Sequence, residues 1–183
     1  MSLYNEELIQ ARIDAFRNTK HDEVTILFDM DNTLYRFSIY KQDGLALQEA
    51  YTKGFYKNLP IFPEAPYVVE ALQKMGMHVG ICTSLIDSPY CKTEKEDSLW
   101  YYFPMIPQND IIMVPEGQSK IDHIKDISNT ILIDDWHGNI MKMYEQGGIA
   151  IKKSYSEKQR PVPTVHNLVE LFPVLHDLKC FRK

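Results

Sequence analysis

The sequence lacks several features that would assign it to a large class of proteins. No apolar run approaches the roughly 20 residues that a membrane-spanning helix needs, so we expect no membrane partner. The 20 lysines and arginines are outnumbered by 25 aspartates and glutamates, for a net charge of -5. This balance argues against a broad nucleic-acid surface, which needs a basic stripe. The first residues, MSLYNEELIQAR, are acidic and polar, unlike a signal peptide.

Cysteine is scarce, and two common catalytic motifs are missing. Cys82, Cys91 and Cys180 form no C-x-x-C pair, and this odd number at unrelated spacings indicates reduced thiols in a cytoplasmic protein. No G-x-S-x-G nucleophile motif and no Walker A loop occur. What remains is a chain of 183 residues, 44% of them hydrophobic, which is enough for one domain with a single buried core.

Short apolar runs alternate with amphipathic stretches along the chain. The runs are too continuous for half-exposed strands and predict buried strands of a parallel sheet at 24–28, 78–82, 111–114, 130–133 and 149–151. Helical periodicity covers 4–18, 66–75, 94–103, 137–146 and 165–178. We expect Pro173 to break or kink the last helix and Trp100 to Phe103 to pack their helix onto the sheet. The alternation predicts an α/β fold, a Rossmann-like parallel sheet with helices on both faces.

The connection after the first predicted strand is unusually long. Besides a crossover helix it contains residues 34–62, which are rich in tyrosine, phenylalanine and leucine and predict a small helical cap. We therefore expect a core domain formed by 21–33 and 63–183, with the cap inserted after its first strand. Residues 1–20 form a separate amphipathic helix that either docks on the core or mediates a homodimer.

Carboxylates stand at the ends of two predicted strands. Asp29 and Asp31 come after the first strand, and Asp134 and Asp135 after the fourth apolar run. Because ligands of open parallel sheets bind beyond the carboxyl ends of the strands, these four side chains are expected to converge on one edge. Crowded negative charges raise each other's pKa unless a cation lies among them. Oxygen ligands select a hard ion such as Mg²⁺, with substrate phosphate oxygens completing its shell.

The first acidic pair has the residue types for phosphate chemistry. An ionised Asp29 can act as a nucleophile that forms an aspartyl-phosphate, while Asp31 can protonate the leaving alkoxide and later activate water. An Asp-x-Asp-Asn segment is also typical of a structural turn. The second acidic pair at 134–135 favours the functional interpretation.

Four motifs resemble, in order and spacing, those of the haloacid dehalogenase-like (HAD) phosphatase superfamily. DMDNTL at 29–34 resembles the first motif, ICTS at 81–84 the second, and ILIDD at 131–135 the fourth, while Lys120 stands where the lysine of the third is expected. The resemblance implies a HAD-like fold. The dehalogenase branch lacks the second aspartate of the first motif, so Asp31 favours a phosphatase.

The resemblance also implies roles for these residues. Asp29 would be the nucleophile and a metal ligand, and Asp31 the general acid/base and a ligand through its backbone carbonyl. Thr83 and Lys120 would stabilise the charge of the phosphoryl group. Asp135 would complete the Mg²⁺ site with Asp134 beside it. Adjacent strand residues point in opposite directions, so the sequence leaves open which of these two coordinates the ion.

The flanking residues resemble a narrower family, the 5'(3')-deoxyribonucleotidases. GFYKNLPIFP at 54–63 is similar to their cap segment, and Tyr90-Cys91, Glu94-Lys95 and Trp100 to the run that comes after their second motif. The resemblance implies a (deoxy)nucleoside monophosphate as substrate, because aromatic side chains offer a stacking face to a base and an apolar wall favours a sugar without a hydroxyl. The substrate-binding residues would be Phe37, Phe55, Tyr56, Thr83, Ser84 and Lys95.

Several departures from this family leave alternatives open. Asn32 replaces a glycine, Leu85 a proline and Gln118 an arginine, the cap is short, and residues 1–20 have no counterpart. The substrate can instead be a sugar phosphate or another small phosphometabolite. The aromatic residues of the cap can instead form plain lid core. From another class, the protein can be a catalytically silent module that binds a nucleotide or a partner.

Overall fold

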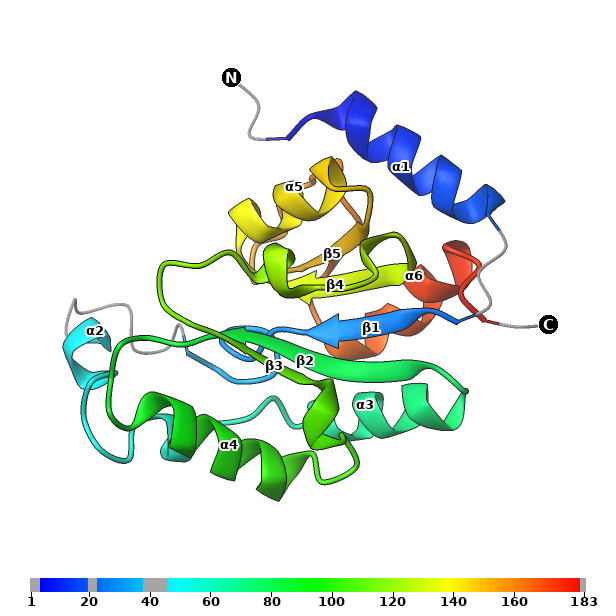
Figure 1. Ribbon diagram of the computed structural model, residues 1–183. Helices are drawn as coiled ribbons and strands as arrows, with labels where there is room; N and C mark the ends of the chain where they lie inside the picture. The colour runs from blue at the N-terminus through cyan, green and yellow to red at the C-terminus, as the bar shows by residue number, and fades with distance from the viewer. Residues whose placement is uncertain (1–3, 20–22, 38–45, 182–183) are drawn as a thin grey trace.

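A single parallel sheet forms the centre of the molecule (Figure 1). The computed structural model describes residues 4–19, 23–37 and 46–181, and its strands are ordered β3-β2-β1-β4-β5-β6. Every neighbouring pair runs parallel. The strands are β1 (Thr25–Phe28), β2 (His78–Ser84), β3 (Ile111–Val114), β4 (Thr130–Asp134), β5 (Ile149–Lys153) and β6 (Thr164–Val165). The predicted α/β class and all five predicted strands are confirmed, whereas β6 is too short to have a recognisable pattern.

Helices cover both faces of the sheet. In Figure 1, α1 and α5 lie on one side of the strands, and α3 and α4 lie on the other. The α-helices are α1 (Glu6–Asn18), α2 (Ala46–Glu49), α3 (Ala65–Lys74), α4 (Cys91–Tyr102), α5 (His137–Glu145) and α6 (Leu171–Asp177). Among the described residues, none of these helices has the length and apolarity to cross a membrane.

The first helix docks on the core, which was one of the two alternatives for it. Asn5 caps α1 by accepting a hydrogen bond from the Leu8 backbone N–H (3.1 Å), and the helix buries Ile9, Ile13 and Phe16 against α5 and β5. This is the apolar face that the periodicity predicts. The homodimer stays a prediction.

Two local predictions were wrong. Pro173 neither breaks nor ends α6, because the helix begins at Leu171 and the proline lies in its first turn, where a backbone N–H has no intrahelical acceptor to lose. Trp100 and Tyr101 do not pack onto the sheet: 64% and 78% of their surfaces are exposed. Only Phe103, 1% exposed, is fully buried as expected.

The strand order places a switch point beside β1. The chain adds β2 and β3 on one side of β1 and then crosses to β4 on its other side. Asp29 continues this pairing beyond β1, since its backbone N–H donates to the Ile133 carbonyl (2.9 Å). Open α/β sheets bind ligands where the strand order reverses, so the first motif stands at the expected position.

The two ends of the segment predicted as a cap, residues 34–36 and 60–62, pair with each other where the segment leaves and rejoins the core. Tyr35 and Ile61 form an antiparallel bridge, the Arg36 N–H donates to the Pro60 carbonyl (2.7 Å), and the Phe62 N–H donates to the Leu34 carbonyl (3.0 Å). Residues 38–45 of the predicted cap lie outside the described residues. The rest contains α2 and a 3-10 turn, Tyr56–Asn58.

Candidate active site

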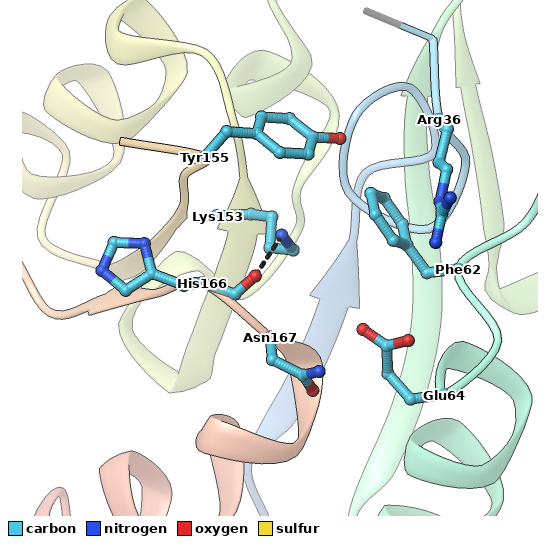
Figure 2. A pocket seen from close by; sticks show the side chains of 7 residues that line it. All are labelled: Arg36, Phe62, Glu64, Lys153, Tyr155, His166 and Asn167. Carbon is cyan, nitrogen blue, oxygen red and sulfur yellow. Dashed lines mark hydrogen bonds between the residues drawn. The ribbon is translucent and has the colours of Figure 1, made fainter. Parts of the chain in front are cut away.

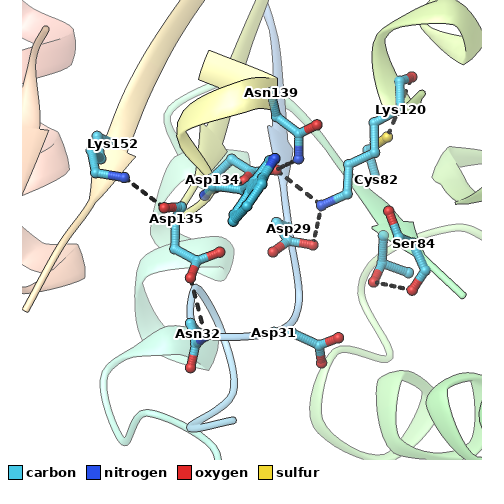
Figure 3. Close-up of polar contacts among 12 residues, drawn as sticks. Asp29, Asp31, Asn32, Cys82, Ser84, Lys120, Asp134, Asp135, Asn139 and Lys152 are labelled. Carbon is cyan, nitrogen blue, oxygen red and sulfur yellow. Dashed lines mark hydrogen bonds and ion pairs between the residues drawn. The ribbon is translucent and has the colours of Figure 1, made fainter. Parts of the chain in front are cut away.

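Three carboxylates meet at the carboxyl ends of β1 and β4 (Figure 3). Asp29, Asp134 and Asp135 each offer an oxygen, and these oxygens all lie within 4.8 Å of one another. Asp29 and Asp134 are buried, at 4% and 0% exposure. The predicted convergence of distant acidic residues on one edge is confirmed for these three, which we call the acidic cluster.

Lys120 lies against the acidic cluster from the 3-10 turn Lys120–His123. Its Nζ contacts Asp29 Oδ1 and donates to Asp134 Oδ2 (2.9 Å). The two oxygens of Asp134 accept further hydrogen bonds, from the Trp136 backbone N–H (2.7 Å) and from Asn139 Nδ2 (3.0 Å). Three protein donors therefore contact the Asp134 carboxylate, two at Oδ2 and one at Oδ1.

The electrostatics of the cluster leave an excess of negative charge. Burial raises the pKa of Asp29 above its ordinary value, Lys120 opposes this rise, and the neighbouring carboxylates add to it. Burial also disfavours the charged form of Lys120, but Asp29 and Asp134 outweigh it and raise the pKa of Lys120, so the lysine is a cation. Among the described residues, two lysines, Lys120 and Lys152, act on the three carboxylates, so one negative charge remains. An all-oxygen donor set with this charge fits a hard divalent cation such as Mg²⁺.

The carboxylate of Asp31 does not belong to the acidic cluster and faces Lys95 instead. Lys95 on α4 is 1% exposed, and its Nζ donates to Asp31 Oδ2 (2.8 Å), Thr83 Oγ1 (2.9 Å) and the Ser84 carbonyl (2.9 Å). Asp31 Oδ1 is buried and has no hydrogen-bond partner among the described residues. The structure thus brings the first and second motifs together through Lys95 and leaves one oxygen of Asp31 available for a proton.

Asn32 is a site residue whose function the sequence did not reveal. Its φ of 61° is left-handed, a conformation that suits glycine and that asparagine tolerates better than most residues. Its Nδ2 donates to Asp135 Oδ2 (3.0 Å), while Lys152 Nζ donates to the Asp135 carbonyl (2.6 Å). The available signal was that asparagine stands where the deoxyribonucleotidase pattern has a glycine.

Replacing Asn32 by glycine is expected to weaken Mg²⁺ binding. Glycine adopts the same backbone conformation, so the substitution removes only the amide that orients Asp135. Partners that orient metal ligands contribute roughly 10-fold to affinity, and a loss of about this size is expected in a calorimetric Mg²⁺ titration. An unchanged affinity would mean that Asn32 does not orient a metal ligand.

The three aromatic residues proposed to contact substrate form one cluster, which we call the cap aromatic cluster. The Phe55 ring meets those of Phe37 and Tyr56 edge-on, at centroid distances of 5.6 and 5.1 Å. Phe37 and Tyr56 lie stacked at 6.4 Å. Lys95 Nζ lies 5.0 Å from the Tyr56 centroid, so the cluster adjoins the residues around Asp31. Tyr56 is only 2% exposed, whereas Phe37 and Phe55 are half-buried.

Glu94 connects this cluster to α4, and sequence reasoning gave it no role of its own. Its buried carboxylate accepts hydrogen bonds from the backbone N–H groups of Gly54 (2.5 Å), Tyr56 (3.1 Å) and Lys57 (3.4 Å). The segment bearing two of the three rings is thereby fixed to the helix that carries Lys95.

Replacing Glu94 by glutamine is expected to loosen this segment. The neutral amide keeps a single acceptor oxygen, so at least one of the three N–H groups loses its acceptor, which costs about 1–3 kcal/mol. Urea unfolding should show this loss in the free energy of unfolding. The matched control is Glu96→Gln, a less buried carboxylate of the same helix, which should change stability little. Equal effects of the two substitutions would contradict the role of Glu94.

Two of the residues that depart from the deoxyribonucleotidase pattern make local hydrogen bonds. The Leu85 N–H donates to the Val114 carbonyl (2.8 Å), a bond that proline is unable to make. Gln118 is exposed and accepts from His123 Nε2 (2.8 Å). Neither of these two hydrogen bonds involves a residue of the acidic cluster.

The chain matches no protein-family model and no curated protein sequence, but it matches solved structures along most of its length. A dehalogenase aligns with a TM-score of 0.63 at 13% identity, over 86% of this chain and 99% of that one. A protein assigned as a HAD-hydrolase from Bacillus subtilis, bound to magnesium, aligns with a TM-score of 0.58 at 14% identity, over 85% and 99%. A protein assigned as a β-phosphoglucomutase from Bacteroides vulgatus aligns with a TM-score of 0.61 at 16% identity, over 97% and 98%.

These identities establish the fold and nothing finer. The six-stranded parallel sheet with helices on both faces is a HAD-like fold, as the motifs imply. Because the same fold carries several activities, the function has to be argued from the site.

Proposed function

We propose that the protein is a Mg²⁺-dependent phosphomonoesterase that works through an aspartyl-phosphate on Asp29. The observation that carries this proposal is the acidic cluster at the switch point of the sheet, with Lys120 against Asp29 and the Lys95–Asp31–Thr83 contacts beside it. The magnesium bound by one protein of the same fold supports it.

Asp29, Asp135 and the backbone carbonyl of Asp31 would hold the ion. Asp134 is the weaker candidate because both of its oxygens already accept hydrogen bonds, from Lys120, Asn139 and Trp136. Its role is instead to fix Lys120 beside the nucleophile. When bound, Mg²⁺ supplies the positive charge that keeps Asp29 ionised and offsets that of the phosphate.

The reaction has two steps, transfer of the phosphoryl group to Asp29 and its hydrolysis, and each site residue has a role in one or both. Lys120 and the Thr83 hydroxyl bind the phosphoryl oxygens. An oxygen of Asp29 attacks phosphorus while the bond to the leaving oxygen breaks, and that oxygen takes a proton from Asp31. Water then attacks the phosphoryl group, its proton passes to Asp31, and the bond between Asp29 and phosphorus breaks. Lys95 holds Asp31 by Oδ2, which leaves Oδ1 to carry the proton.

A nucleoside monophosphate, in particular a deoxynucleotide, is the substrate class that we propose first. The half-buried rings of Phe37 and Phe55 pack against Tyr56, whose centroid lies 5.0 Å from Lys95 Nζ, and a base would lie against these rings while its phosphate reaches Asp29. Ser84 and Lys95 would contact the same substrate. The resemblance of residues 54–63 to the deoxyribonucleotidase cap segment supports this choice.

A smaller phosphate ester, such as a sugar phosphate, is the second candidate. The observation that favours it is the close packing of the cap aromatic cluster, in which Tyr56 is 2% exposed and Phe55 meets both other rings edge-on. One protein of the same fold is assigned as a phosphoglucomutase, which acts on such compounds.

A panel of phosphate esters assayed with Mg²⁺ separates these candidates. The first predicts that kcat/KM for deoxynucleoside monophosphates exceeds that for sugar phosphates by at least about 10-fold, a ratio that stacking contacts can supply, and that Phe55→Ala removes this preference. The reverse order would select the sugar phosphates. No turnover of any ester, an aryl phosphate included, would contradict the hydrolase and leave the silent binding module.

A further inference from the structure

A second pocket lies between the end of β5, the segment after β6 and the base of the inserted segment (Figure 2), and Tyr155 in its wall donates a hydrogen bond to the Asn32 carbonyl (3.5 Å). The volume of the pocket is about 370 Å³, within the range of about 300–1,000 Å³ that is typical of small-molecule sites. No residue of the acidic cluster or of the cap aromatic cluster lines it. Side chains from the end of β5 and from the segment after β6 face others from the base of the inserted segment, and those used below are Arg36, Phe62, Glu64, Lys153 and Tyr155.

Lys153 is a buried cation in the wall of this pocket. It is 1% exposed, its Nζ donates to the His166 carbonyl (2.7 Å), and it lies 4.8 Å and 4.7 Å from the ring centroids of Phe62 and Tyr155. Within the described chain, no carboxylate oxygen comes within 4.0 Å of it. Ring faces stabilise an ammonium only partly, and burial lowers the pKa of Lys153.

Arg36 is a second cation without a carboxylate partner in the described residues. Its guanidinium lies 5.2 Å from the Phe62 centroid, and its buried Nε has no hydrogen-bond partner in the same part of the chain. A buried donor without an acceptor is unfavourable. Phe62 thus contacts two cations at once, and each of them has N–H groups to offer to a ligand.

We propose that this pocket binds a small organic anion, whose carboxylate or phosphate-like group pairs with Lys153 and Arg36 and whose apolar part contacts Phe62 and Tyr155. Among the lining side chains two cations face one carboxylate, that of Glu64, while Glu170 and Asp135 act on Lys153 from outside the pocket. The guanidinium supplies paired donors and the ammonium a point charge, a combination suited to carboxylates and phosphates. Nothing in this assignment depends on the proposed phosphatase activity.

The test uses phenylphosphonate, which is not hydrolysed, with the full chain in EDTA. Without a divalent cation the acidic cluster repels anions, so binding there is suppressed. We expect saturable binding in calorimetry and shifts of the backbone amide signals of residues 153–155 and 166–167 in NMR spectra. Lys153→Met and Arg36→Met should each weaken binding by at least about 10-fold. Lys158→Met, which removes the same charge from an exposed position outside the pocket, should leave it unchanged.

Three results would overturn the proposal. The first is that the wild-type protein does not bind phenylphosphonate at millimolar concentration. The second is that the amide shifts are confined to residues 29–32 and 120. The third is that neither Lys153→Met nor Arg36→Met alters the affinity. Because Lys153 is buried, its variant can fail to fold. The half-buried Arg36 and the shifts in the wild-type spectrum then decide the question. Turnover is not measured, so a failure here is distinct from a failure of the phosphatase.

Discussion

Replacing Asp29 by asparagine is expected to reduce phosphatase turnover by roughly 10⁴-fold or more, the effect typical of removing a catalytic nucleophile. Asparagine has nearly the same shape but does not form the phosphoryl ester. Steady-state release of inorganic phosphate with Mg²⁺ measures the effect. Turnover at the wild-type rate would contradict the assignment of the nucleophile.

The same variant should fold normally. Burial disfavours the charge of Asp29, so its removal relieves a desolvation cost, and Lys120 keeps its ion pair with Asp134 (2.9 Å). The melting temperature in EDTA is therefore expected to equal or exceed that of the wild type. A large drop would indicate that lost activity reflects unfolding.

Replacing Asp31 by asparagine is expected to separate the two chemical steps. An aryl phosphate has a leaving group that needs no proton, so the first step should still occur, whereas hydrolysis of the aspartyl-phosphate loses its general base, worth about 10²–10⁴-fold. Stopped-flow measurements should show a stoichiometric burst of phenolate before slow turnover.

The matched control for Asp31 is Asp97→Asn, an exposed carboxylate of α4 that should behave like the wild type. Lys95 retains its bonds to Thr83 and the Ser84 carbonyl in the Asp31 variant, so the site should stay assembled. Equal slowing of both steps would contradict the role of Asp31 as a base in the second.

The sheet and its acidic edge were predictable because they depend on simple periodicity. Buried parallel strands are continuous apolar runs, and the residues directly after such strands all lie at the same edge of the sheet. The positions of Asp29, Asp134 and Asp135 agree with that rule. β6 was not predictable, since two residues form no pattern. The predicted break or kink at Pro173 was wrong because the effect of a proline depends on where its helix begins.

The contacts within the site were less predictable, since they depend on side chains meeting across the fold. Lys95 is on a helix whose apolar pattern is weak, and nothing in the sequence indicates that its Nζ reaches both Asp31 and Thr83. From the sequence, Glu94 has the pattern of a surface residue of the same helix. Only the structure shows that the backbone of residues 54–57 packs against it. Asn32 stands where the deoxyribonucleotidase pattern has a glycine. The sequence does not show that its side chain bonds to Asp135, because this bond depends on the left-handed backbone at Asn32.

The decisive measurement for the proposed mechanism is the identification of the residue that carries the phosphoryl group. The protein is mixed with an aryl phosphate and Mg²⁺, quenched during turnover and treated with borohydride, which reduces an aspartyl-phosphate to homoserine, and its peptides are then sequenced by mass spectrometry. An aspartyl-phosphate on Asp29 predicts homoserine at position 29 and at no other aspartate, with a higher yield in the Asp31→Asn variant. Turnover without any modification at position 29, or modification at position 31, 134 or 135 instead, would contradict it.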